Sequence, residues 1–305
     1  MLMYVVRRIC VSILVALFVS GLSFFLLYAA GDPATAILGA SATETDIAAV
    51  RERYGFDRPL IVQYASWLWR ALQGDFGDSF FLRVPVEILI AQRLPVTMLL
   101  GSCAIVFALV LAIPLGVVAA LRPNSIVDRL ALFISVIGQA MPSFWFALLL
   151  ITWFSVAWPL LPSSGSDSWQ HFVLPTVALG YYAMPAIMRL TRSGMIEVMN
   201  SDYIRTARSK GLSSWQITVK HALRNAIVPV VSLAAAQFGF MLAGSVVIES
   251  VFAIQGAGRL AYESIVRGDI PTMQAVILIF SLTYVVLTFA ADLLVAWLSP
   301  RVRLV

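Results

Sequence analysis

Charged side chains are scarce in this sequence, which has 305 residues, of which 12% are charged and 60% are hydrophobic. A soluble domain carries roughly 25% charged residues, so the composition excludes an ordinary soluble protein. With a mean hydropathy of +0.90, the chain is predicted to be a polytopic membrane protein. Lysine is almost absent, with Lys210 and Lys220 alone, and the arginines are scattered. The net charge of +5 therefore does not indicate nucleic acid as a partner, because membrane proteins collect Lys and Arg on their cytoplasmic side.

Cysteine and histidine are also rare, which limits the chemistry that the chain can perform. Cys10 and Cys103 lie in separate apolar runs, where a lone cysteine is usually a small core residue, so we expect no disulfide. His171 and His221 are predicted on opposite sides of the membrane, so we expect no metal site. No Ser/His/Asp or Cys/His set is assembled from these parts, and the chain is predicted not to be an enzyme.

The sequence lacks G-x-x-x-x-G-K-[ST], the loop that cradles nucleotide phosphates. We therefore expect this chain to bind no cofactor of its own. If its function uses ATP, the ATPase must be a separate polypeptide.

Six apolar segments are long enough to cross a membrane, since a span needs about 20 predominantly apolar residues. They are residues 9–30, 97–121, 131–158, 172–190, 227–248 and 274–298. The first is longer than the apolar core of a signal peptide, so we interpret it as a retained helix. The predicted fold class is therefore all-α, a polytopic membrane protein with six transmembrane helices.

The basic residues predict the orientation of these spans. Arg7 and Arg8 precede the first span and Arg301 and Arg303 follow the last, whereas the loop between spans three and four has no Lys or Arg. The positive-inside rule then places both termini in the cytoplasm. Residues 31–96 become an external loop region, in which 58–72 is predicted to be an amphipathic helix.

One long basic segment, "DYIRTARSKGLSSWQITVKHALRN" at 202–225, separates the fourth and fifth spans. Asp202 suits a helix start because an acid in the first turn complements the helix dipole. Gly211 stands where a helix often ends in a left-handed residue, and Leu212 can supply the hydrophobic contact of such a cap. Ser213 or Ser214 can cap a second helix. The pattern predicts two short helices joined at a sharp corner, which is a rigid projection.

The same segment carries a family resemblance. "RTARSKG" is similar to the "EAA…G" loop of ABC importer permeases, with Arg205, Thr206 and Ala207 at the Glu-Ala-Ala positions and Gly211 at the glycine. Arg205 and Thr206 depart from the general Glu-Ala-Ala pattern. They match the branch of the family that carries dipeptides and oligopeptides, including its nickel and glutathione importers. In that branch "DYxRTARxKGL" and "HxLRNAxxP" are typical. "GDP" at 31–33, "GDFGDSF" at 74–80 and "GSVVIESVF" at 244–252 extend the resemblance over nearly the whole chain.

The resemblance implies the type I ABC permease fold, with residues 94–295 as its transmembrane domain and 197–225 as a cytoplasmic coupling loop. It implies a multi-pass protein of the bacterial inner membrane, in contact with lipid. The implied partners are a second related permease, two ATPase subunits that use ATP, and an external substrate-binding protein. In the family this loop docks on the ATPase. The residues implied for docking are Asp202, Tyr203, Arg205, Thr206, Ala207, Lys210, Gly211 and Leu212.

The resemblance favours di- or oligopeptides as cargo, and nickel chelates, glutathione, opines and oligosaccharides stay open as alternatives. A more distant alternative is an ion-coupled secondary transporter or channel, which would carry charges at the membrane midplane. Polar residues inside spans are candidates for lining a pathway. They are Gln139, Ser143, Gln237 and Ser245. The competing interpretation of the glutamines is hydrogen bonding between helices.

Overall fold

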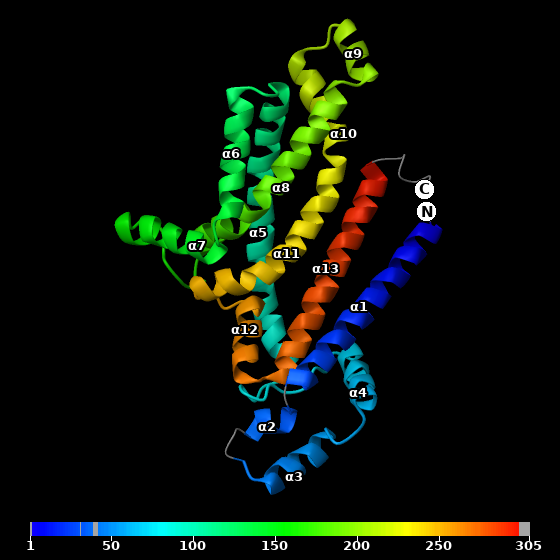
Figure 1. Cartoon of the computed structure of the whole chain (residues 1–305), viewed down its shortest axis with the longest axis vertical. Coiled ribbons are helices and arrows are strands. Elements are labelled where there is room, and N and C mark those ends of the chain that lie inside the picture. The colour runs from blue at the N-terminus through cyan, green and yellow to red at the C-terminus, as the bar shows by residue number, and fades with distance from the viewer. Residues whose placement is uncertain (1, 31, 39–41, 299–305) are drawn as a thin grey trace. The chain divides into compact units, whose positions relative to one another are not determined.

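The computed structural model describes residues 2–30, 32–38 and 42–298, and the secondary structure of this part is helical, without a strand (Figure 1). The chain divides into two compact units. Unit 1 comprises residues 1–97 and 255–285, and unit 2 comprises residues 98–254 and 286–305. The prediction of an all-α protein is confirmed for the described residues. Arg301 and Arg303, which support the predicted orientation, lie outside them.

Unit 1 is built from seven helices or parts of helices in the described residues. They are α1 (Leu2–Ala30), α2 (Pro33–Leu38), α3 (Glu44–Tyr54), α4 (Leu60–Leu72), the first part of α5 (Val86–Leu121), α12 (Ala257–Arg267) and the first part of α13 (Ile270–Leu298).

Unit 2 contains the rest of α5 and α13 together with the helices between them. They are α6 (Ile126–Ala140), α7 (Ser143–Ile151), the π-helix η1 (Thr152–Ala157), the 3-10 helix η2 (Trp169–Phe172), α8 (Val173–Met199), α9 (Asp202–Ser209), the π-helix η3 (Gln216–Leu223), α10 (Arg224–Ala226) and α11 (Val228–Val251).

Five helices of the described chain are long and apolar enough to cross a membrane. They are Val6–Phe25, Val86–Leu121, Trp169–Met199, Val228–Val251 and Ile270–Trp297. Each overlaps one of the predicted spans. The predicted span 131–158 is wrong as a single helix, because α6 ends at Ala140 and α7 begins at Ser143. Pro142 has no backbone N–H and holds Met141 in an extended conformation with ψ 135°, so the helix is interrupted there.

Asp269 fixes the loop before α5 to the start of α13 in unit 1. Its buried carboxylate accepts hydrogen bonds from Ser79 Oγ at 2.5 Å, from the Phe80 N–H at 3.0 Å and from Thr272 Oγ1 at 2.8 Å. Val86 is fully buried nearby in a cluster with Leu260 and Val276. This burial explains why α5 starts well before the predicted residue 97.

The α1 and α4 helices meet through aromatic side chains. Phe24 packs beside Tyr64 and Trp67, and the hydroxyls of Ser20 and Tyr64 lie 2.8 Å apart. Trp67 is 6% exposed whereas Trp69 is 66% exposed, so the predicted amphipathic helix is confirmed and its buried face is the one that carries Trp67.

Two glycines let α5 and α8 touch backbone to backbone in unit 2. A Cβ on Gly180 would lie 2.5 Å from the carbonyl oxygen of Ala104, and a Cβ on Gly116 would lie 2.8 Å from that of Met188. Real side chains do not come so close to a backbone oxygen, so only glycine permits these two contacts.

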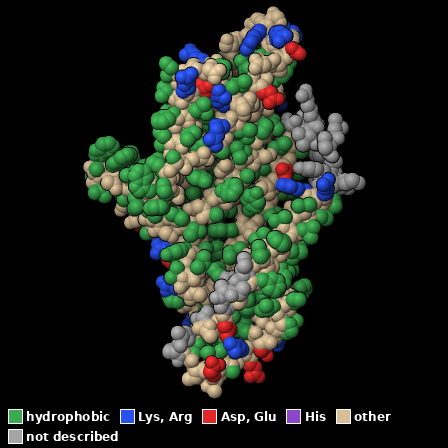
Figure 2. Space-filling model, in the orientation of Figure 1, with side chains coloured by type: hydrophobic (Ala, Val, Ile, Leu, Met, Phe, Trp, Pro, Cys, Tyr) green, Lys and Arg blue, Asp and Glu red, His purple; other side chains and the backbone are tan. Residues whose placement is uncertain are grey.

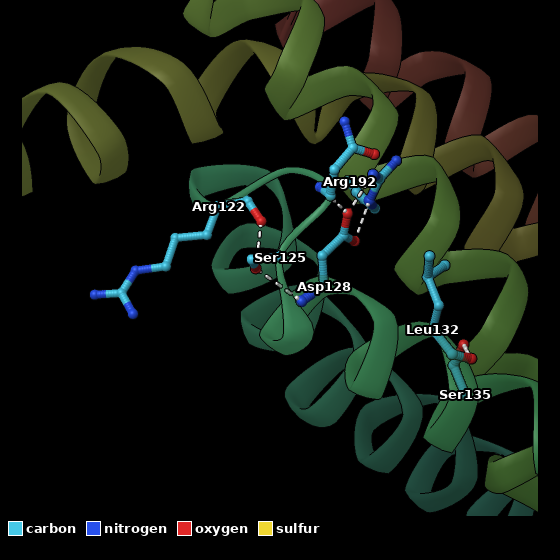
Figure 3. Close-up of polar contacts among 7 residues, drawn as sticks. Arg122, Ser125, Asp128, Leu132, Ser135 and Arg192 are labelled. Carbon is cyan, nitrogen blue, oxygen red and sulfur yellow. Dashed lines mark hydrogen bonds and ion pairs between the residues drawn. The ribbon is translucent and has the colours of Figure 1, made fainter.

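A buried ion pair ties α6 to α8 (Figure 3). Asp128 is 2% exposed and accepts two hydrogen bonds of 2.6 Å, from Nε and Nη2 of Arg192. The Asn124 N–H donates to the same carboxylate at 2.8 Å, and Ser125 caps the helix. These bonds from Arg192 hold the pKa of Asp128 below its usual range. The pair therefore stays formed above the usual aspartate pKa, and it is lost only when the pH falls through the lower folded-state value.

Candidate functional site

The basic loop is a self-contained corner. The Leu212 N–H donates to the Ala207 carbonyl at 3.3 Å, and the Gly211 N–H donates to the Arg208 carbonyl at 2.9 Å. These two bonds form a Schellman motif that ends α9. Gly211 has φ +77°, and a Cβ added to it would meet no atom within 4 Å, so backbone conformation alone selects glycine. The predicted left-handed corner and the contact of Leu212 with the loop core are both confirmed.

The inner side of the corner is a small hydrophobic core. Ile204 is fully buried and Ala207 is 8% exposed, and both pack with Met195 of α8 and with Ile217 and Ala222 of the second helix. The family resemblance groups Ala207 with the docking residues. In the structure it supports the loop from inside and presents little surface to a partner.

Ser213, one of the two residues predicted to cap the second helix of the loop, is the residue that caps it. Ser213 Oγ accepts the Gln216 N–H at 3.3 Å, and Gln216 Oε1 accepts the Ser213 N–H at 3.2 Å, which is a reciprocal capping box. Ser201, just before α9, makes no such cap, because its hydroxyl donates to the Val198 carbonyl at 2.6 Å.

The outer side of the corner is polar and positively charged. Tyr203 accepts a 2.8 Å hydrogen bond from Asn225 Nδ2, which joins α9 to α10, and Asp202 pairs with Arg205 at 3.4 Å on the surface. Figure 2 shows Lys and Arg side chains gathered at the α9 end of unit 2, whereas hydrophobic side chains prevail along its long helices. The exposed members of this basic surface are Arg205, Arg208, Lys210, Lys220 and Arg224.

A cavity of about 540 Å³ lies among α6, α7, α8 and α11 in unit 2. Three of the four predicted pathway residues, Gln139, Ser143 and Gln237, contribute to its wall. Ser245 does not. It is 1% exposed, and its hydroxyl donates to the Leu242 carbonyl at 2.8 Å. The remaining wall is mostly apolar, with Tyr182 and Phe240 as its exposed aromatic residues.

Arg189 lies next to this cavity, although the sequence pattern does not single it out. Its Nη2 donates to Gln139 Oε1 at 3.3 Å, and its side chain is exposed. The predicted span 172–190 places Arg189 at its very end, whereas α8 continues for about two more turns to Met199. An exposed arginine inside a spanning helix is costly in lipid and marks a water-filled path or a protein partner. A cation thus lies beside the polar side chain of Gln139 in the cavity wall.

Metal ligands do not converge in the part of the chain that the structure describes. No group of three or more His, Cys, Asp or Glu side chains there could hold a metal ion.

Comparison with known proteins gives consistent matches. The family model of the binding-protein-dependent transport system inner membrane component matches residues 112–304, and the N-terminal family model of such membrane components matches residues 1–101. The glutathione transport system permease protein GsiC of Salmonella typhimurium is 40% identical over 304 residues, which are 99% of each chain. GsiC of Escherichia coli K12 is 41% identical over the same length.

A solved structure has a similar fold. One inward-facing structure of the MetNI methionine ABC transporter superposes with a TM-score of 0.59 and 20% identity, over 69% of this chain and 96% of that one.

Proposed function

This chain belongs to the family of binding-protein-dependent transport system inner membrane components, and on that premise we propose that it moves a short peptide across the membrane. It is a permease subunit of an ABC importer, and its relatives are transport subunits and not enzymes. The cargo, the subunit composition and the coupling of ATP hydrolysis to transport are all parts of this proposal.

The proposed assembly contains this chain, a second related permease, two ATPase subunits and an external substrate-binding protein. It resides in the bacterial inner membrane with both termini of this chain in the cytoplasm, where the basic surface meets the ATPases. Support comes from the loop itself. Its exposed side carries Arg205, Arg208 and Lys210, while its inner side is closed by its own core. A closed, charged corner suits docking better than a flexible connector does.

The cavity in unit 2 is the proposed half of the translocation path. A short peptide presents amides that both donate and accept hydrogen bonds, and the side-chain amides of Gln139 and Gln237 offer both functions. A peptide also has an anionic carboxylate end, which the guanidinium of Arg189 can bind with two parallel hydrogen bonds. Glutathione, the cargo named for the GsiC relatives, is a tripeptide with two carboxylates and is the first candidate.

The contacts of the loop support the proposed coupling. Ile204 and Ala207 share a core with Met195 of α8 and with Ala226, which leads into α11. When ATP binding brings the ATPases together, a displacement of α9 passes through this core to α8 and α11. Both helices line the cavity, which then switches between inward-facing and outward-facing states.

The 40% identity to GsiC over nearly the full length, joined to a cavity that carries Gln139, Gln237 and a neighbouring arginine, is the observation that carries the cargo assignment. The test is ATP hydrolysis by the reconstituted complex with its binding protein. Di- to pentapeptides, glutathione, nickel–histidine, an opine and an oligosaccharide are supplied in turn. We expect stimulation by glutathione or short peptides. Stimulation by one of the other compounds alone would overturn the peptide assignment and leave the ABC importer assignment standing.

A further inference from the structure

Unit 1 contains a second cavity, of about 1000 Å³, that has no part in the transport path proposed above. Its wall is formed by the end of α1, one residue of α2, the end of α3 and the turn after it, α4, residues 75–85, and the starts of α5 and α13. Unlike the cavity in unit 2, it is rich in charged side chains. We call it the unit 1 cavity.

Arginines outnumber acidic residues in this wall by one. Four of them line it, Arg53, Arg58, Arg70 and Arg83, against three acids, which leaves one net positive charge. The side chains of Arg58, Arg70 and Arg83 make no hydrogen bond or ion pair with another residue in the described part of the chain. The acids are Asp75, Asp78 and Glu87, and Asp75 already accepts the Gly77 N–H at 2.9 Å.

Two buried N–H donors in the same wall also lack an acceptor among the described residues. They are Nε1 of Trp67 and Nε2 of Gln274, on side chains that are only 6% and 4% exposed. Buried donors destabilise a protein unless an acceptor reaches them. The wall therefore favours a ligand with several oxygen atoms and negative charge. Because arginine binds phosphate with two parallel hydrogen bonds, a phosphate group fits this chemistry.

The position of the unit 1 cavity along α1 and α13 indicates that a lipid headgroup is the source of such a phosphate. The apolar run of α1 continues to the end of the helix at Ala30, just before Asp32, and the apolar span of α13 begins at Ile270. Phe24 and Tyr28 on α1 and Ile270 on α13 all line the cavity. The cavity thus lies where hydrocarbon gives way to lipid headgroups, a level at which aromatic side chains also collect.

The α4 helix adds an apolar surface suited to the same level. Its side chains Ile61, Trp69 and Leu72 are 74%, 66% and 73% exposed, while Arg70 of the same helix lines the cavity. An amphipathic helix of this kind lies in the membrane interface with its apolar residues among the acyl chains. A lipid beside α4 can keep its acyl chains in the membrane and place its headgroup against Arg70.

From this arrangement we propose that the unit 1 cavity binds the glycerol-phosphate headgroup of an anionic phospholipid. Arg58, Arg70 and Arg83 hold the phosphate, and the ring of Trp67 covers the glycerol. The lipid then links α1, α4 and α13 in addition to the protein contacts of Phe24 with Trp67 and Leu278.

The experiment is lipid binding to the delipidated, purified transporter complex, followed by native mass spectrometry. Phosphatidylglycerol and phosphatidylcholine are titrated in turn. We expect phosphatidylglycerol to bind at least about fivefold more tightly, and the variant Arg58→Gln/Arg70→Gln to lose about tenfold of this affinity. Arg122→Gln, which removes an exposed charge in unit 2, serves as the control and leaves the affinity unchanged. Size-exclusion profiles verify that each variant folds, and Arg70→Lys, which keeps the charge but loses the planar fork, gives an intermediate affinity.

Four outcomes would contradict the proposal. Equal affinity for both lipids would show that the cavity does not recognise the headgroup. An unchanged affinity in the double variant would show that Arg58 and Arg70 do not bind it. Displacement of the lipid by soluble glycerol phosphate at a comparable concentration assigns the cavity to a free metabolite instead. A double variant that binds lipid normally but loses activation by the binding protein makes the arginines a protein-docking surface.

Discussion

Gly211 and Ala207 show how differently two positions of one motif are constrained. Gly211 is selected by its positive φ in open space, whereas Ala207 is buried in the loop core. A change at Gly211 therefore acts through the backbone, and a change at Ala207 acts through packing. Neither residue needs to touch a partner in order to matter for docking.

We expect Gly211→Val to weaken the attachment of the ATPase subunits while the spans still insert. A β-branched residue at this φ costs about 1–2 kcal/mol relative to the right-handed conformation. Gly211→Asn is the matched control, because asparagine tolerates the left-handed region much better. Co-purification of the ATPases with each variant gives the measurement. Equal recovery with valine and asparagine would show that the corner does not position the docking surface.

Arg189 provides the residue-scale test of the pathway. Arg189→Gln removes the cation beside Gln139 and is expected to raise the KM for glutathione-stimulated ATP hydrolysis about tenfold, the equivalent of one charge-assisted hydrogen bond. Arg189→Lys is expected to retain part of the affinity. A peptide with an amidated C-terminus, which lacks that carboxylate, should lose little in either variant. A similar loss for both cargos would mean that Arg189 only supports the fold.

At the scale of whole elements, the sequence predicts helix ends and caps well, because these depend on residues only a few positions apart. The left-handed corner at Gly211 follows from residue types at fixed offsets, so the sequence predicted it, and it limited the cap of the second helix to Ser213 or Ser214, of which the structure uses Ser213. The face of the second helix could not be predicted in this way. A helical pattern places Trp215 and Val219 on one apolar face with Ala222 and Leu223, but Trp215 is 75% exposed and Val219 38% exposed.

The reason for that error is the π-helix η3. Its hydrogen bonds run from residue i to i+5, so Ile217 and Ala222, five residues apart, fall on the same buried side. A pattern counted at 3.6 residues per turn assigns the wrong face. The position of Arg189 beside the cavity is hidden for a different reason, because sequence alone does not show that Gln139, 50 residues earlier in the chain, lies against this part of α8.

The contact between α5 and α8 gives an element-scale prediction. Gly→Ala in a helix normally stabilises by roughly 0.5–1 kcal/mol, but at Gly180 the new Cβ would meet the Ala104 carbonyl at 2.5 Å. We therefore expect Gly180→Ala to lower the melting temperature of the purified complex. Gly244→Ala, whose Cβ would meet only Leu179 Cδ1 at 3.5 Å, should leave it unchanged or raise it. Equal melting temperatures for the two variants would show that the close contact between Gly180 and Ala104 does not contribute to stability.

At the scale of the whole molecule, the orientation in the membrane is still a prediction from basic residues. Single cysteines at Thr45, Ser166 and Ser213, in a background without Cys10 and Cys103, can be treated with a membrane-impermeant thiol reagent. Thr45 and Ser166 should react in intact cells, and Ser213 only after lysis. Reaction of Ser213 from outside would reverse the proposed topology and move the basic loop away from any cytoplasmic ATPase.

The glycine contacts of α5 and α8 also restrict how unit 2 can move. Two rods that touch at one point can pivot about it, but Ala104 and Gly116 lie 12 residues apart on α5, or about 18 Å along its axis. Because α5 and α8 touch at both points, they cannot pivot about one contact, and the two helices can move only together as one rigid unit. The proposed rotation that exposes the cavity to one side or the other would then take place elsewhere. The interruption of the α6–α7 segment at Pro142 lies in the cavity wall and is a place where the helical hydrogen bonding is already broken.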